Sequence, residues 1–184
     1  MRKVLVTLLA LVTMVLVLVV PASAKHSTHV SGDWPDYGLI TGPPSFTERG
    51  KTCFIEGDFW YEWGGDIEGI SYAHLEIVSH GPCYGEDGTP YPKGSFREGL
   101  KVTGSFEGCV HDRCGTFEYR ELMTFTPVSG GPAEAPDYDL EGRIIISHGA
   151  GGLAGLHGVL TEEGGRRDGV EEGGYEGEIH FDPK

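Results

Sequence analysis

The sequence predicts an all-β protein, and three observations lead to this fold class. Thirty glycines and 11 prolines separate short segments rich in aromatic and β-branched residues, which is typical of strands joined by turns. Within these segments apolar and polar residues alternate with a period of two. No stretch after residue 24 has an apolar period of 3.6 residues long enough for a helix.

Residues 1–24 have the three-part pattern of a secretory signal peptide. Arg2 and Lys3 precede an uncharged run, Val4–Val20, and small residues close the segment at Ala24. The alternative is a membrane anchor, because a run of 17 apolar residues is at the short limit for crossing a bilayer. The cleavage pattern favours removal, so we expect a secreted or periplasmic protein with no stable membrane insertion after cleavage.

Length and charge limit what the remaining chain can be. Removing residues 1–24 leaves 160 residues, which suits one domain with a core of its own. It also leaves 12 basic residues against 28 acidic ones, a net charge of −16 with histidine neutral. Such a charge repels phosphate backbones, so nucleic acid is excluded as a partner, and it favours solubility outside the cell.

The expected domain covers residues 51–184, after an extended N-terminal arm at 25–50 that contains Trp34-Pro35 and Gly42-Pro43-Pro44. Seven strands are expected, at residues 53–63, 66–79, 100–108, 115–126, 138–147, 153–163 and 174–181. Long connections are expected at 80–94 and 127–136, and a charged, exposed loop at 164–173. Seven or eight antiparallel strands with one apolar face each must pair as two sheets or close on themselves, and an eight-stranded closed barrel removes the sheet edges most completely.

Four cysteines follow the leader, and an even number in an exported protein indicates two disulfides. Cys109 and Cys114 flank a four-residue hairpin loop, which would place them opposite each other. That pairing leaves Cys53 with Cys83. The alternative is a zinc site on Cys109, His111 and Cys114, but this spacing is unusual and an oxidising compartment competes for the thiols. We therefore predict disulfides and no metal.

Two parts of the chain carry a resemblance to a known fold family. The segments Ile146–Leu160 and Tyr175–Phe181 resemble the closing strands of the allene oxide cyclase-like barrels, and Gly57–Gly69 is similar to the strand-turn-strand of that group. The likeness is greatest to the small uncharacterised prokaryotic members. It implies a lipocalin-like eight-stranded barrel, sometimes with an apolar cavity. No segment matches the active-site residues of the cyclases one for one, so the resemblance assigns no catalytic residue.

Glu121 is the candidate for interior chemistry. Counting in steps of two places it on the same face as Phe117, Tyr119, Met123 and Phe125, which points into the barrel. A carboxyl group buried among aromatic rings has a raised pKa and can act as an acid or a base, or hold a polar group of a ligand. A bulge near Arg120 that turns Glu121 toward water is the alternative, and so is a structural partner near the barrel mouth.

Aromatic residues are the candidate binding surface. Phe59, Tyr61 and Trp63 share one face of a strand, with Tyr72 nearby, and Tyr119 and Phe125 share the face of Glu121. They either line a pocket for an apolar ligand or fill the core, and the small size of the barrel favours the core. Four histidines in expected strands are interpreted as surface residues; they are His74, His148, His157 and His180.

These observations favour an exported, disulfide-containing β-barrel that binds a small apolar molecule or a protein surface, without a cofactor. The alternatives are a cyclase- or isomerase-type enzyme that uses an interior carboxylate such as Glu121, and a secreted interaction protein without a cavity. A cavity beside Glu121 would favour the enzyme, and a filled interior would favour the interaction protein. The specific role and the oligomeric state do not follow from the sequence.

Overall fold

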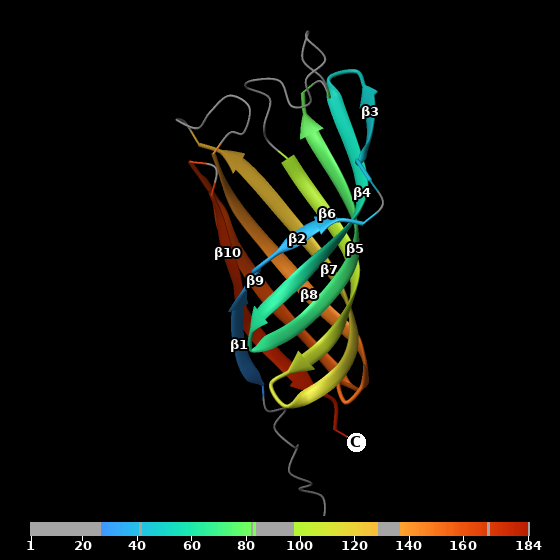
Figure 1. Cartoon of the computed structure of the whole chain (residues 1–184), viewed down its shortest axis with the longest axis vertical. Coiled ribbons are helices and arrows are strands. Elements are labelled where there is room, and N and C mark those ends of the chain that lie inside the picture. Colours follow the sequence, from blue (N-terminus) through green and yellow to red (C-terminus); the bar gives the residue numbers. More distant parts are fainter. Residues whose placement is uncertain are drawn as a thin grey trace, which may run out of the picture.

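The computed structural model describes residues 27–40, 42–81, 83, 98–128, 137–168 and 170–183, and every element in these ranges is a strand (Figure 1). The predicted all-β class is therefore confirmed. The strands are β1 (Thr28–Asp33), β2 (Tyr37–Leu39), β3 (Ser45–Arg49), β4 (Thr52–Gly65), β5 (Ile67–His80), β6 (Glu98–Val110), β7 (Arg113–Pro127), β8 (Tyr138–Gly151), β9 (Leu156–Arg167) and β10 (Val170–Phe181). The expected leader and most of the two long connections at 80–94 and 127–136 lie outside the described residues.

All the described strands belong to one antiparallel sheet. Each strand from β4 to β10 pairs with the next one along the chain, so the seven strands expected from the sequence form a continuous meander. Figure 1 shows these long strands inclined to the long axis of the molecule. Their side chains alternate strictly between buried and exposed over most of β5 and β7, which is why the period of two identified them.

The first strand joins the two ends of this meander. β1 pairs with β10 along its whole length, from Thr28 opposite Ile179 to Asp33 opposite Gly174, and its last two residues also pair with the end of β4. The backbones approach so closely there that a Cβ on Gly32 would lie 1.9 Å from the carbonyl oxygen of Gly64. Only glycine fits at this crossing, so the pairing of β1 with β4 depends on Gly32.

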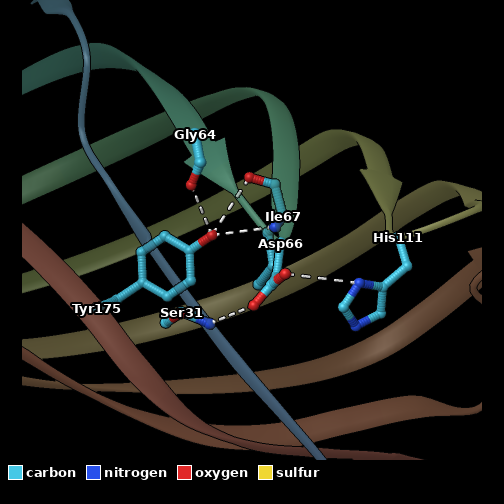
Figure 2. Close-up of polar contacts among 6 residues, drawn as sticks. All are labelled: Ser31, Gly64, Asp66, Ile67, His111 and Tyr175. Atoms are coloured by element: carbon cyan, nitrogen blue, oxygen red, sulfur yellow. Dashed lines mark hydrogen bonds and ion pairs between the residues drawn. The ribbon is translucent and has the colours of Figure 1, made fainter.

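Polar contacts hold this junction together (Figure 2). The Tyr175 hydroxyl accepts a hydrogen bond from the Ile67 N–H at 3.1 Å and donates to the Gly64 carbonyl at 2.9 Å. Asp66 accepts a hydrogen bond from the Ser31 N–H at 2.9 Å and lies 3.7 Å from the His111 imidazole. One tyrosine of β10 therefore satisfies backbone groups at the turn between β4 and β5, next to the place where β1 pairs with β4.

The segment expected as an N-terminal arm is part of the sheet, so the boundary predicted at residue 51 is displaced. Within residues 27–50, β1 pairs with β10 and β4, and β2 and β3 both pair with β4. The three strands are only three to six residues long and bury one side chain fully, that of Val30. Their place in the sheet is set by the partner strands, and a pattern this short carries little periodicity.

The charged loop expected at residues 164–173 is mostly strand. β9 continues to Arg167 and β10 begins at Val170, with Gly164 opposite Gly173 in the register. This part of the hairpin has no alternating apolar residues, because it lies where the interior is hollow. The sequence pattern ended there, although the backbone pairing does not.

Buried aromatic and aliphatic side chains of the strands pack into one core. Trp63 lies at its centre, with ring centroids 5.6 Å from Phe106 and 5.8 Å from Phe117, and the last two rings stack at 4.3 Å. Both expected disulfides are present: Cys53 bonds to Cys83, and Cys109 bonds to Cys114, its direct partner across the β6–β7 pair. The thiols are consumed, so the alternative zinc site on this hairpin is wrong.

Two disulfides are consistent with an oxidising compartment outside the cytoplasm. Across the described ranges, no helix is long and apolar enough to cross a membrane.

Candidate functional site

Inward side chains of the long strands line a cavity of about 460 Å³. Its wall includes the five aromatic residues that the sequence proposed for binding, Phe59, Tyr61, Trp63, Tyr119 and Phe125. Trp63 and Tyr119 are almost fully buried and also belong to the core, whereas the other three are partly buried. Core and pocket are therefore not alternatives here, because one aromatic cluster serves both.

Tyr72, considered beside these aromatic residues, points away from the cavity. It is 55 % exposed, because β5 directs Ser71 and Ala73 inward and Tyr72 outward. Ser71 forms a polar link at the edge of the core instead. Its fully buried hydroxyl oxygen accepts hydrogen bonds from Trp63 Nε1 and from the Tyr119 hydroxyl, both at 3.0 Å. These bonds fix the two rings between the core and the cavity.

Glu121 points into the cavity, as counting in steps of two predicts, and is only 5 % exposed. A register irregularity does occur between Thr116 and Glu118, but the partner residues there are Ala150 and Ser147. The extra residue is thus in β8, where His148 has a positive φ of 54°. The bulge leaves the alternation of β7 intact, so it does not turn Glu121 toward water.

Glu121 faces a second buried carboxyl group, Glu162 of β9, which is also 5 % exposed. Burial raises the pKa of both groups, and for Glu121 the hydrogen bond to Glu162 and its negative charge raise it further. The same hydrogen bond lowers the pKa of Glu162. Glu121 is therefore the member of the pair that holds a proton more strongly, and it donates the hydrogen bond to Glu162.

Three side chains with hydroxyl or indole donors lie near this carboxyl pair. Desolvation raises the pKa of Tyr61 and of Tyr119, and the charges that Glu121 and Glu162 carry when ionised raise it further. Both phenols line the cavity together with the pair. The Trp34 N–H lies near enough to Glu162 to lower its pKa. However, Trp34 Nε1 and Glu162 Oε2 are both buried, and neither has a partner at full hydrogen-bond geometry in the described ranges.

Glu98, at the start of β6, is a third buried carboxyl group in the wall of the cavity. It is 4 % exposed, and burial raises its pKa from 4.5 to about 7, against a hydrogen bond from Ser79 that lowers it. Its Oε1 atom has no hydrogen-bond partner among the residues that the structure describes. A carboxyl group with this pKa is divided between its acid and its anion near neutral pH.

The buried polar atoms that lack partners gather in this one place. Among the described residues there are four such side-chain atoms: Trp34 Nε1, Glu98 Oε1, Glu162 Oε2 and Arg166 Nε. All four residues line the cavity. Since an unpaired buried polar group costs about 1–3 kcal/mol, four of them around one hollow indicate a space that water or a ligand completes.

Tyrosines and charged residues surround the outer part of the cavity. The hydroxyls of Tyr37 and Tyr138 each donate to one carboxylate oxygen of Glu171, which connects β2 and β8 to β10. Burial raises the pKa of Tyr37 to about 12, and the hydrogen bond to Glu171 adds to this shift. Arg166 acts on both tyrosines in the opposite sense.

Sequence reasoning missed Glu162, Glu98 and Trp34. Glu162 has the same signal as Glu121, because it continues the inward series Leu156, Gly158, Leu160 in steps of two. Glu98 precedes the expected start of its strand by two residues, and Trp34 lies between the short strands β1 and β2, where no periodicity could place it.

The described histidines do not form a metal centre. His74 and His148 are exposed and lie at 2.9 Å from Asp58 and 3.0 Å from Glu118. His157 and His180 are partners across the β9–β10 pair, with ring centroids 3.6 Å apart. Within the described ranges, no group of three or more His, Cys, Asp or Glu residues is arranged to hold a metal ion.

No protein-family model and no curated protein sequence matches this chain. A similar solved structure is that of a protein of unknown function from the DUF3224 family of Shewanella oneidensis MR-1. It has a TM-score of 0.55 and 19 % sequence identity, over 86 % of this chain and 100 % of that one. At this identity the likeness concerns the fold alone.

Proposed function

We propose that this protein binds a small, mainly apolar molecule in the interior cavity, with a polar group of that molecule at the Glu121–Glu162 pair. The single observation that carries this proposal is the gathering of four unpartnered buried polar atoms around one aromatic-lined hollow. Binding pockets combine an apolar wall with a few polar groups that converge on the ligand. The hollow favours a small molecule over a protein surface as the target.

The proposal extends to the architecture and the location of the protein. β1 together with the seven strands β4 to β10 would form a closed eight-stranded barrel of the lipocalin-like type, and the pairing of β1 with both β10 and β4 supports closure. The resemblance to the allene oxide cyclase-like barrels fits this proposal. Export follows from the leader pattern and is consistent with the two disulfides.

A cavity-filling variant tests the proposal. Met123 lines the cavity at 8 % exposure, whereas its neighbour Leu122 is 61 % exposed on the opposite face of β7. We expect the neutral dye N-phenyl-1-naphthylamine to bind the native protein with saturable fluorescence. Met123→Trp is expected to weaken this binding at least about tenfold, since the indole occupies the ligand space, and Leu122→Trp to leave it unchanged.

Thermal unfolding of both variants shows whether each is folded at the assay temperature. Absence of saturable dye fluorescence with the native protein would contradict interior binding. Equal affinities of the two folded tryptophan variants would contradict it as well, because they differ mainly in which side of the wall they alter.

A cyclase- or isomerase-type enzyme is the second candidate function, and the cavity directly beside Glu121 favours it. A carboxyl group that is protonated in an aromatic site and backed by a carboxylate can give a proton to a bound molecule and take one back. If so, Glu121→Gln retains the ligand but leaves it unchanged, while the native protein converts it to an isomer. Chromatography of the ligand recovered from each protein distinguishes catalysis from binding.

A further inference from the structure

The charges that line the cavity are predominantly negative. Among the described residues, six acidic side chains contribute to its wall and one basic side chain, Arg166. Arg166 acts on Tyr37 and Tyr138 in the outer part of the cavity, and it is not among the groups that act on the Glu121–Glu162 pair. Among the described residues, the groups that interact with this pair are the phenols of Tyr61 and Tyr119 and the indole of Trp34, none of which is positive.

Within the described part of the chain, carboxyl oxygens without a partner at full hydrogen-bond geometry lie at two places in this acidic wall. Glu98 Oε1 and Glu162 Oε2 are the buried carboxyl oxygens without a partner among the described residues, and both side chains are more than nine-tenths buried. Each of them can accept at least one hydrogen bond from a donor that enters the cavity. An oxygen of this kind accepts most strongly from a charged N–H group.

Four aromatic rings line the cavity together with Glu162. Trp34 packs against Trp63 at 4.4 Å between ring centroids and lies 6.5 Å from Tyr61, and Trp63 lies 5.5 Å from Tyr119. These four rings all line the cavity. The faces of indole and phenol rings attract cations, and the attraction grows where water is excluded.

We infer that the ligand of this cavity is a protonated amine on an apolar body, with its ammonium group between the Glu121–Glu162 pair and the surrounding aromatic rings. This inference rests on the proposed function and names its ligand class. Three features each favour a cation: the acidic wall, the unpartnered carboxyl oxygens and the ring faces. A carboxylate-bearing ligand is disfavoured by the first two.

The protonation of the Glu121–Glu162 pair decides whether ligand binding releases a proton. Burial keeps the proton on Glu121 when no cation is present. An ammonium group beside the pair favours the ionised form of Glu121, whose proton passes to the solvent. Ammonium binding therefore lowers the pKa of Glu121, and it releases a proton at every pH at which the free protein still holds one there, while binding of a neutral molecule releases none.

Three probes with the same aromatic body test the inference: 1-naphthylmethylamine, 1-naphthylmethanol and 1-naphthoate. Isothermal titration calorimetry at pH 7.5 is expected to show the amine binding at least about tenfold more tightly than the alcohol, and the carboxylate more weakly than both. Titrations in phosphate and in Tris buffer are expected to differ in heat for the amine, which measures the released proton. These comparisons use the native protein and do not depend on the folding of a variant.

Variants test whether the Glu121–Glu162 pair causes the preference for the amine over the alcohol. Glu121→Gln with Glu162→Gln is expected to bring the affinity for the amine down to that for the alcohol. Glu163→Gln, which alters the exposed neighbour on the same strand, is the control and should preserve the preference.

Equal binding of the amine and the alcohol, or tighter binding of the carboxylate, would overturn the inference while the proposed function stands. Binding of N-phenyl-1-naphthylamine without any binding of the amine would overturn it in the same way. Failure of the dye and of all three probes would remove the proposed function as well.

Discussion

Replacing Glu98 by Gln is expected to stabilise the protein at neutral pH and to have little effect in mild acid. The carboxyl group is buried in the cavity wall, and this burial raises its pKa from 4.5 to about 7. Between these values the unfolded chain has lost the Glu98 proton and the folded protein still holds it. The contribution of protonated Glu98 to stability is therefore lost as pH rises through this window, and it is fully present only below about pH 4.5.

The size of the effect follows from the width of the window. The pKa difference spans about 2.5 pH units, and each unit corresponds to ~1.4 kcal/mol. Ionisation of Glu98 thus costs the folded protein up to ~3 kcal/mol above pH 7. Gln has nearly the shape of the protonated acid, and its amide oxygen still accepts the hydrogen bond from Ser79.

Urea unfolding followed by tryptophan fluorescence at pH 4.5 and pH 7.5 measures this difference. Glu98→Gln should match the native protein at the lower pH and exceed its free energy of unfolding by ~1–3 kcal/mol at the higher pH. Glu163→Gln, on the exposed side of β9, is the control. If the stability of Glu98→Gln relative to the native protein is the same at both pH values, Glu98 does not titrate in a buried site.

Two further predictions concern the frame around the cavity. Tyr175→Phe removes the hydroxyl that bonds to the Gly64 carbonyl and the Ile67 N–H, so it should lower the free energy of unfolding by ~1–3 kcal/mol. Tyr72→Phe, at an exposed position, is the control and should leave it unchanged. Equal stability of Tyr175→Phe and the native protein would contradict the role of this junction. Gly104→Ala places a Cβ 2.6 Å from the Tyr119 ring and should cost ~1–3 kcal/mol in urea unfolding, whereas Gly99→Ala on the same strand meets nothing within 4 Å. A harmless Gly104→Ala would show that this ring is free to move.

The seven long strands were predictable because each buries one face, and the period of two appears wherever a side chain enters the core. Phe117, Tyr119, Glu121 and Met123 illustrate this, since all four are buried and separated by exposed residues. Glu121 was predictable for the same reason. The polarity of its side chain did not matter to the counting, because the backbone alone decides which face a residue occupies.

The features that could not be predicted from the sequence depend on contacts between distant segments. β1 buries a single residue, Val30, and its pairing with β4 relies on two backbones meeting at Gly32. The partner of Glu121 comes from a strand 41 residues later, Glu162, and no local pattern relates the two. The hollow itself was unpredictable, because a cavity is set by how side chains of many strands fill a shared space.

The most direct test of the account is a pH titration of the side-chain carboxyl carbons of Glu121 and Glu162 by NMR, in protein labelled at glutamate and assigned with the two Gln variants. We predict that Glu121 titrates well above 4.5 in the free protein and that saturating 1-naphthylmethylamine moves this titration to lower pH. Ordinary titration of both groups near 4.5, unchanged by the amine, would contradict the buried carboxyl pair on which the proposed site rests.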